Sequence, residues 1–320
     1  MRQLKAIKKI IFITGIFIFI GCDNEEFPPS EFEIGHTNLS TAYSITVIDQ
    51  FAYVTDNDGL TIIDITDKTH PRKASVISTT NSPLDIFVEN NIAYLGSVGD
   101  DGLVIIDIND KNNPVILSRL YISNSVEGIC KNHEILYLCS WDGYFYAVDI
   151  SDLTSPTLIS SLNCGGNGVD LKHYNDIIYF ANSQKGLQLI NIENLENPTI
   201  TSIATNSYGA WDIDINAEFL YLGKHMEGFS IYQIDEGGYL SILSSKDEGG
   251  EVYGISEDEN TLYIGDLQDG VEIWDIRNKN QPQLITTIDE YHPHDIARYS
   301  GYTFLADQDR DFVILDIVGI

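Results

Sequence analysis

Carboxylates recur at one register of the chain and are its strongest candidates for chemistry. They follow one another at about 42 residues or at twice that distance, at Asp85, Asp170, Asp212 and Asp295. Aromatic or imidazole side chains stand beside them or in nearby loops, at Trp141, Trp211, Tyr253 and His294. Carboxylates attract cations and aromatic faces stack on cations or sugars, so this set predicts a site for a cationic or polyhydroxylated ligand. The alternative is structural, with each Asp accepting hydrogen bonds from backbone N–H groups of adjacent repeats.

Two other segments are weaker candidates for binding a metal. Asp307-x-Asp309-x-Asp311 has the alternating oxygen ligands that Ca²⁺ prefers, but the glycine and the distal glutamate of an EF-hand are missing. We therefore expect a solvated acidic loop there, with a weak Ca²⁺ site as the alternative. His292 and His294 lie among carboxylates, but a transition-metal site would need a third defined ligand. No motif of the sequence requires a cofactor.

The overall charge restricts the class of partner. The sequence holds 48 Asp and Glu against 18 Lys and Arg, for a formal net charge of −30. This balance argues against a nucleic-acid partner, because phosphate binding needs clustered Lys and Arg. A G-x-S-x-G elbow, an HExxH motif and a glycine-rich phosphate loop are absent from the sequence. A non-catalytic role is favoured, although an enzyme that assembles its site from several repeats stays open.

The N-terminus has the layout of an export signal. Residues 1–9 are basic, residues 10–20 form an apolar run, and Gly21-Cys22 follows at once. A run of this length rises about 16 Å as a helix, too little to span a hydrocarbon core of roughly 30 Å. We therefore expect residues 1–21 to be a cleaved signal peptide. Residues 22–31, acidic and rich in proline, are expected to form a tether.

The junction at Cys22 resembles a bacterial lipobox. Phe19-Ile20-Gly21-Cys22 has a small residue before the Cys, although that family prefers Leu where this chain has Phe19. The resemblance implies that Cys22 is acylated and that this lipid is the only membrane anchor; the alternative is an ordinary signal peptide. It also implies the cell envelope of a Gram-negative bacterium. The acidic residues after Cys22 favour the outer face of the outer membrane, whereas in enteric bacteria an Asp there implies inner-membrane retention.

Seven copies of one pattern fill the rest of the chain. Each has an aromatic strand, a short loop and an apolar strand, which starts at Gly59, Gly102, Gly143, Gly186, Gly228, Gly270 and, in the seventh copy, Asp311. Each copy holds four runs of alternating polarity, which in the second copy cover about 84–88, 92–97, 102–108 and 114–120. Seven such units predict an all-β fold, a seven-bladed β-propeller of four-stranded antiparallel blades over residues 32–320.

The first and last units are incomplete in complementary ways. The last unit ends after its third strand, whereas residues 31–38 precede the first inner strand, where every other unit has a fourth strand. We expect this N-terminal segment to become the outer strand of the seventh blade and to close the ring. Closure would remove an exposed sheet edge.

The apolar strand resembles the LVIVD repeat of bacterial cell-surface propellers. The matching segments include Leu103-Val104-Ile105-Ile106-Asp107, Leu60-Thr61-Ile62-Ile63-Asp64 and Phe312-Val313-Ile314-Leu315-Asp316. The resemblance implies the propeller fold and a binding or scaffolding role without a common reaction. Units four and five depart from it at Asn191 and Gln233, and we expect different turns in those two blades.

Three cysteines follow Cys22 and are candidates for a disulfide. Cys130 and Cys139 belong to consecutive strands of one unit, and Cys164 to a loop on the same face as Cys139. Buried thiols are the expectation for all three, with a Cys139–Cys164 disulfide as the alternative.

Three classes of function remain. The leading class is a surface- or periplasm-facing binding or scaffold propeller, with a protein, glycan or other envelope ligand on its loop-rich top face. The second is an extracytoplasmic hydrolase or lyase that acts on glycans or peptides through carboxylates and His at the channel mouth. The third is a structural subunit of an envelope complex, in which the rim of the propeller makes the contacts.

Overall fold

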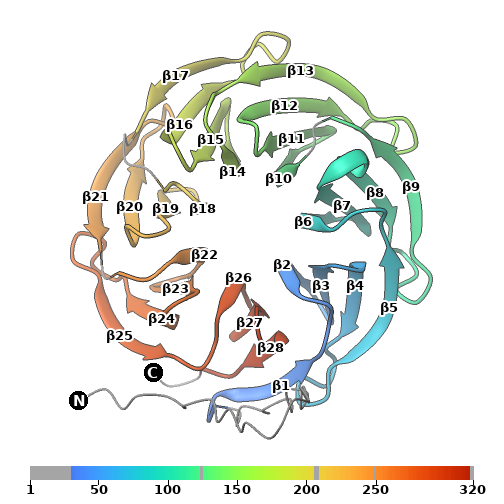
Figure 1. Ribbon diagram of the computed structural model, residues 1–320. Coiled ribbons are helices and arrows are strands. Elements are labelled where there is room, and N and C mark those ends of the chain that lie inside the picture. The colour runs from blue at the N-terminus through green and yellow to red at the C-terminus, as the bar shows by residue number, and fades with distance from the viewer. Residues whose placement is uncertain (1–29, 123–124, 205–208, 248, 318–320) are drawn as a thin grey trace, which may run out of the picture.

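The computed structural model describes residues 30–122, 125–204, 209–247 and 249–317. Cys22 and the predicted signal peptide lie outside these ranges, as does the predicted tether up to residue 29. The described residues form seven four-stranded antiparallel sheets, arranged as blades around a central channel (Figure 1). The predicted seven-bladed all-β propeller is therefore confirmed. Among the described residues, no helix is both long and apolar enough to cross a membrane.

In each blade the first strand lies nearest the channel and the fourth lies at the rim (Figure 1). Blade one holds β2 (Ala42–Ile48), β3 (Phe51–Asp56), β4 (Gly59–Asp64) and β5 (Arg72–Ser78). Blade two holds β6 (Pro83–Glu89), β7 (Ile92–Ser97), β8 (Leu103–Asp107) and β9 (Val115–Leu120), with the 3₁₀ helix η1 (Gly99–Asp101) before β8. Blade three holds β10 (Val126–Asn132), β11 (Ile135–Ser140), β12 (Tyr144–Asp149) and β13 (Thr157–Asn163).

The remaining blades repeat this order. Blade four holds β14 (Gly168–Tyr174), β15 (Ile177–Asn182), β16 (Gly186–Asn191) and β17 (Thr199–Ile203). Blade five holds β18 (Asp212–Ile215), β19 (Phe219–Gly223), β20 (Phe229–Ile234) and β21 (Leu240–Lys246). Blade six holds β22 (Val252–Asp258), β23 (Thr261–Asp266), β24 (Gly270–Asp275) and β25 (Gln283–Ile288). Blade seven holds β26 (Pro293–Tyr299), β27 (Tyr302–Asp307), β28 (Asp311–Leu315) and, from the other end of the chain, β1 (Glu33–Thr37).

Period-two alternation explains why the third strands are apolar on both faces. Successive side chains of a strand point to opposite faces of the sheet. In β8, Leu103 and Ile105 pack into the core shared with blade three, whereas Val104 and Ile106 pack into the core shared with blade one. Each blade therefore buries both faces, and the apolar core consists of layers between blades.

The last residue of the third strand caps the turn to the fourth strand. In blade two, the Asp107 carboxylate accepts a hydrogen bond from the backbone N–H two residues on, at 2.8 Å. In blade four, the Oδ1 atom of Asn191 accepts the equivalent bond at 3.2 Å. The expectation of a different turn is wrong for blade four, because the amide oxygen replaces the carboxylate oxygen. It is confirmed for blade five, where Asp235 caps a shorter hairpin through the N–H groups of Gly237 and Tyr239.

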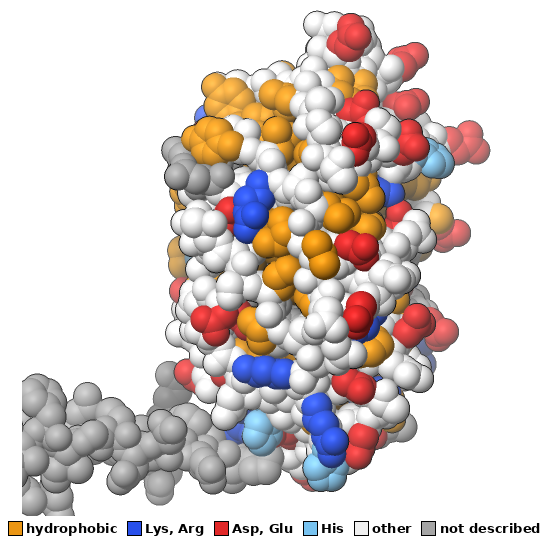
Figure 2. All heavy atoms as spheres, turned by 90° about the vertical axis from the view of Figure 1, so that its right-hand side faces the viewer, with side chains coloured by type: hydrophobic (Ala, Val, Ile, Leu, Met, Phe, Trp, Pro, Cys, Tyr) orange, Lys and Arg blue, Asp and Glu red, His pale blue; other side chains and the backbone are white. Residues whose placement is uncertain are grey.

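Serine hydroxyls on four outer strands each bind their blade to the following one. Each donates at 2.6–2.7 Å to a backbone carbonyl in the turn of the following blade, in the pairs Ser75–Lys111, Ser118–Leu153, Ser160–Leu195 and Ser244–Lys279. Figure 2 shows this rim, where apolar side chains lie among polar ones and acidic side chains gather toward one edge of the disc.

The N-terminal strand closes the ring as expected. β1 pairs with β28 in antiparallel register, so the two ends of the described chain share blade seven (Figure 1). Glu33 contacts the Tyr291 hydroxyl at 3.0 Å and Arg310 at 2.6 Å. A Cβ atom on Gly35 would lie 2.1 Å from the Lys68 carbonyl oxygen, so only glycine allows β1 to approach blade one this closely.

Candidate functional site

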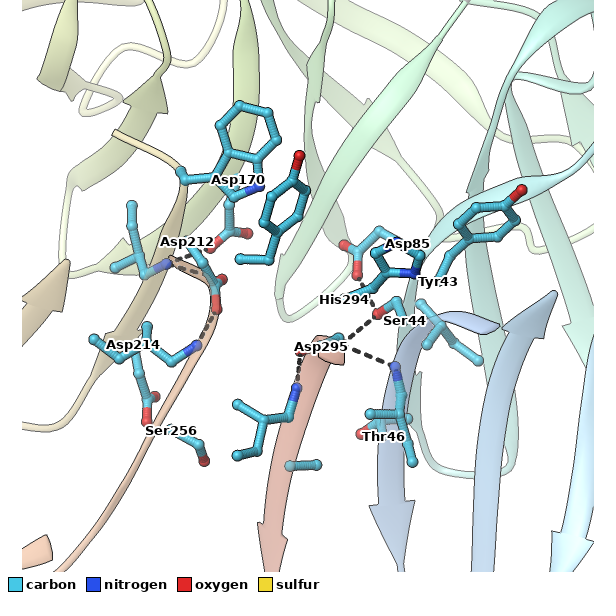
Figure 3. Close-up of a pocket in the computed structure, with 18 of the residues that line it drawn as sticks. Tyr43, Ser44, Thr46, Asp85, Asp170, Asp212, Asp214, Ser256, His294 and Asp295 are labelled. Atoms are coloured by element: carbon cyan, nitrogen blue, oxygen red, sulfur yellow. Dashed lines mark hydrogen bonds between the residues drawn. The ribbon is translucent and has the colours of Figure 1, made fainter. Parts of the chain in front are cut away.

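The seven inner strands surround a cavity of about 580 Å³ at the centre of the propeller, shown in Figure 3. Two neighbouring positions at the start of these strands determine what lines its mouth. One is the register of the predicted carboxylates. The position before it carries Tyr43, Leu84, Glu127, Val169, Trp211, Tyr253 and His294, all of which line the cavity.

All four predicted aspartates line the cavity, and each also binds the next blade. One carboxylate oxygen of each accepts a backbone N–H from the following inner strand. The pairs are Asp85 with Ile129 at 2.8 Å, Asp170 with Ile213 at 3.0 Å, Asp212 with Ile255 at 2.7 Å and Asp295 with Ile45 at 2.9 Å. The structural alternative is therefore confirmed for these bonds. Ligand binding by the same carboxylates stays a prediction.

Two groups of the chain itself contact these carboxylates: the Ser44 hydroxyl and the Lys172 ammonium. Ser44 Oγ lies 3.1 Å from Asp85 and 2.9 Å from Asp295, as the close-up shows (Figure 3). Lys172 Nζ lies 2.9 and 3.0 Å from the two oxygens of Asp170. Burial alone would lower the pKa of Lys172, but Asp170, Asp212 and Asp85 together raise it above its ordinary value. The charged form of Lys172 is therefore favoured, and the channel contains an ammonium group paired with Asp170.

Lys172 was not among the residues singled out from the sequence. It lies two residues after Asp170 on the same inner strand, and period two places both on the same side. The corresponding residue of blade five is Asp214, whose carboxylate accepts the Glu257 N–H at 2.7 Å. A basic residue at this register of a strongly acidic chain was the available signal.

Burial raises the pKa of several carboxyl groups around the channel. Desolvation is the main cause in each case, because the charged form loses water. It raises the pKa of Asp295 to about 7 and that of Asp214 to about 6. The pKa values of Asp85 and Asp212 are also raised, first by burial and then by the negative charge of Asp170. Near neutral pH the ring therefore carries less negative charge than its composition indicates.

Six rings lie in contact with one another at the mouth. We call this set the aromatic arc; it consists of Trp141, Trp211, His225, Tyr253, His294 and Tyr43. Trp211 is its centre, with ring centroids 4.7 Å from His225, 4.9 Å from Tyr253 and 6.3 Å from Trp141. Tyr253 and His294 are 6.1 Å apart, and so are His294 and Tyr43. The arc brings together four predicted residues with two that were not singled out, Tyr43 and His225.

Hydrogen bonds hold the end of the arc that crosses into blade one. His294 donates from Nδ1 to the Ala42 carbonyl at 2.9 Å, and the Tyr43 hydroxyl donates to Asn57 Oδ1 at 2.7 Å. At the other end, Trp141 projects from the loop after β11 and is 44% exposed. Smaller or acidic groups also line the mouth, of which Glu127 has a pKa raised mainly by burial. At the position before the carboxylate register the cavity lining is therefore aromatic or imidazole on blades five, six, seven and one, and aliphatic or acidic on blades two, three and four.

The three aspartates of the predicted acidic loop have separate partners. Asp307 is buried and accepts backbone N–H groups of its own loop and of His292. Asp309 lies 2.9 Å from the His292 ring, and Asp311 accepts the Leu39 N–H at 2.7 Å. Within the described ranges, no group of three or more His, Cys, Asp or Glu is placed to hold a metal ion. Ca²⁺ binding there stays a prediction without support from these contacts.

Cys130, Cys139 and Cys164 are free, buried thiols in the core between blades three and four. Burial raises the pKa of each thiol, so the reactive thiolate is disfavoured. The expectation of buried thiols is confirmed, and the alternative disulfide is wrong.

These features define a repeat protein of the β-propeller class, with an acidic channel and an aromatic arc at its mouth. Its sequence matches the LVIVD repeat at residues 41–79, 83–121, 135–164, 249–290 and 292–318. Because these segments cover more than half of the sequence, the chain belongs to the LVIVD-repeat family. The matches omit residues 165–248, which hold blades four and five, the two units that depart from the repeat pattern.

One solved structure shows the same fold. The crystal structure of the computationally designed Ika8 protein is similar over 89% of this chain and 100% of that chain, with a TM-score of 0.67 and 12% sequence identity. This likeness concerns the fold alone. No curated protein matches the sequence.

Proposed function

We propose that the protein is a lipid-anchored, non-catalytic binding protein of the bacterial cell envelope, with its ligand site at the channel mouth. The observation that carries this proposal is the aromatic arc. The fold sets the carboxylate register, but nothing in the repeat requires rings at the position before it. Aromatic side chains gathered at a concave, partly polar opening are typical of ligand sites. The exposed Trp141 extends the arc onto the top surface.

Catalysis is the second candidate, and the raised pKa values of Asp214 and Asp295 are the observation in its favour. A carboxyl group that is protonated near neutral pH can act as a general acid. Each of these two carboxylates, however, accepts a backbone N–H of a neighbouring blade. This role accounts for their burial without a reaction, so binding is the better supported function.

Capture from an extract of the native envelope tests binding at the mouth. We expect the wild-type protein to retain an envelope component, and Trp211→Ala and Trp141→Ala each to reduce its retention about tenfold or more. Tyr239→Ala is the matched control, because Tyr239 is an exposed aromatic residue on the opposite face. Thermal unfolding should be similar in all four proteins. Full retention by both Trp variants would place the binding site elsewhere.

The lipid anchor is proposed from the lipobox-like junction at Cys22 and the acidic segment after it. β1 is the outermost strand of blade seven, so a tether that precedes it would join the propeller at the rim and leave the mouth free. Cys22→Ala should move the protein from the membrane to the soluble fraction, with the buried thiol variant Cys130→Ala as the control. Membrane association of Cys22→Ala, with no acyl mass on the wild-type N-terminal peptide, would contradict the proposal.

A further inference from the structure

The proposed function leaves the chemical class of the ligand open. We propose that the ligand is a neutral, extended glycan whose sugar rings stack along the aromatic arc. This inference rests on the proposed function, in which the mouth is the binding site. The competing class is a polyamine or a basic peptide, which the strongly acidic composition would attract. Three features of the mouth favour the glycan.

The first feature is that the chain supplies its own cation to the carboxylates. Lys172 Nζ lies 2.9 and 3.0 Å from the oxygens of Asp170, and its charge also acts on Asp212 and Asp85. A ligand ammonium would have to displace this one, which is already held in place by the strand and loses little freedom there. The best position for a cation in the mouth is therefore occupied.

The second feature is that Asp85 and Asp295 already accommodate a hydroxyl group. Ser44 Oγ lies between Asp85 and Asp295, within hydrogen-bond distance of both. Both oxygens of Asp295 also accept backbone N–H groups, and burial raises the pKa of this carboxyl group to about 7, so it attracts a cation less strongly than a fully charged carboxylate would. Sugar hydroxyls donate and accept, whereas an ammonium group only donates.

The third feature is that the rings form a strip and not a cage. A cage for an ammonium group needs rings that surround one point. Here Trp211, His225 and Tyr253 contact one another, with ring centroids 4.7, 4.9 and 5.4 Å apart, so the three rings are packed together and leave no space for an ammonium group between them. The strip continues to His294 and Tyr43 in steps of 6.1 Å, across blades five, six, seven and one. The C–H groups of sugar rings suit the negative faces of such aromatic rings.

A retention assay with chemically treated probes tests the ligand class. The full chain is immobilised in mild detergent, and the probe is the polysaccharide fraction of the native envelope. One portion is treated with periodate, which cleaves vicinal diols, one with proteinase K, and one is left untreated. We expect periodate to reduce retention about tenfold or more and proteinase K to leave it unchanged. Raising the salt concentration from about 0.05 to about 0.5 M should change retention less than about twofold, because no charge is exchanged.

Two variants and a cationic probe separate this proposal from the proposed function. Trp211→Ala should lose about tenfold in retention of the untreated fraction, whereas Tyr239→Ala should behave as wild type. Hexalysine should show no saturable binding to the wild type.

Three results would overturn the glycan while leaving binding at the mouth intact. They are salt-sensitive hexalysine binding that Trp211→Ala abolishes, loss of retention after proteinase K but not after periodate, and no retention of the polysaccharide fraction by a wild type that still captures another envelope component. Equal retention by wild type and Trp211→Ala in every arm would instead overturn the mouth as the site.

Discussion

Replacing Asp170 with Asn should destabilise the propeller by about 2 kcal/mol. The residue is 8% exposed, and its carboxylate accepts the Ile213 N–H at 3.0 Å and pairs with Lys172 at 2.9 Å. Asn keeps an acceptor for the N–H but leaves the ammonium without its closest counter-charge. Breaking a buried ion pair from one side costs about 3–5 kcal/mol. Lys172 keeps 32% of its side chain exposed, and Asp212 and Asp85 remain nearby, so screening reduces this cost to about half.

Urea unfolding at neutral pH measures the change in free energy. The set consists of Asp170→Asn, Lys172→Met, the double variant and, as the control, Asp289→Asn, which removes an exposed carboxylate. Because the double variant removes both charges, it should be about 1 kcal/mol more stable than the two single changes predict together. The control should stay within about 0.5 kcal/mol of wild type. The thermal midpoint of Asp170→Asn should fall by about 4 °C.

Wild-type stability in Asp170→Asn would refute the reasoning, because the Lys172 ammonium would then not depend on the Asp170 charge. If that variant also lost the envelope ligand, Asp170 would belong to the ligand site and not to the scaffold. Additive effects of the two single changes would show that other carboxylates hold Lys172.

Three further changes test other parts of the fold. Deleting residues 31–38 should expose the edge of β28, lower the free energy of unfolding by at least about 3 kcal/mol and promote association. Ring closure would be contradicted by a deletion variant that unfolds in urea like its parent and elutes as a monomer in size-exclusion chromatography. Burial raises the pKa of Asp214 to about 6, so its stabilising protonation is complete below about pH 4 and is lost as the pH rises through 6. Between pH 8 and pH 5, wild type should therefore gain roughly 1 kcal/mol more than Asp214→Asn, and equal gains would count against this assignment. Ser118→Ala should lower the free energy of unfolding by about 1 kcal/mol, because the Leu153 carbonyl loses its hydrogen-bond donor at 2.6 Å. Ser241→Ala, which changes an exposed serine, should lower it by almost nothing. Equal losses would contradict a stabilising role for the Ser118 hydroxyl.

The blades were predictable because each copy repeats the same local physics. Alternating apolar residues in segments such as 103–107 can be buried on both sides only when a sheet lies between two others. The closing strand followed from the missing fourth strand of the last unit. The turn of blade four was missed because Asn191 looks like a departure from the repeat, although its side-chain oxygen accepts the same bond as an aspartate would.

The site was predictable in part. Period two and the repeat register gave the four carboxylates and most of the aromatic arc. His225 lies outside the strands, and only the fold brings its ring within 4.7 Å of Trp211. Period two places Lys172 on the same side of its strand as Asp170. Its charge state, however, also depends on Asp212 and Asp85 from other blades, and the sequence does not show how close these side chains lie to Lys172. Contacts between blades determine the surroundings of both His225 and Lys172. Periodicity within one strand does not predict such contacts.

The two neighbouring positions at the mouth differ because they face different surroundings. At the carboxylate register the side chain meets the backbone of the next blade. Blade three has Gly128 there, and a Cβ atom would already lie 2.9 Å from both Asp170 Cα and Cys139 Sγ. One position earlier the side chains line the open cavity, where Val169 and Trp211 on adjacent blades are both accommodated. The first position is therefore limited to residues that fit or bind the neighbouring blade. The second is free to vary at little cost to the fold, and this freedom allows a uniform repeat to carry an aromatic arc at its mouth.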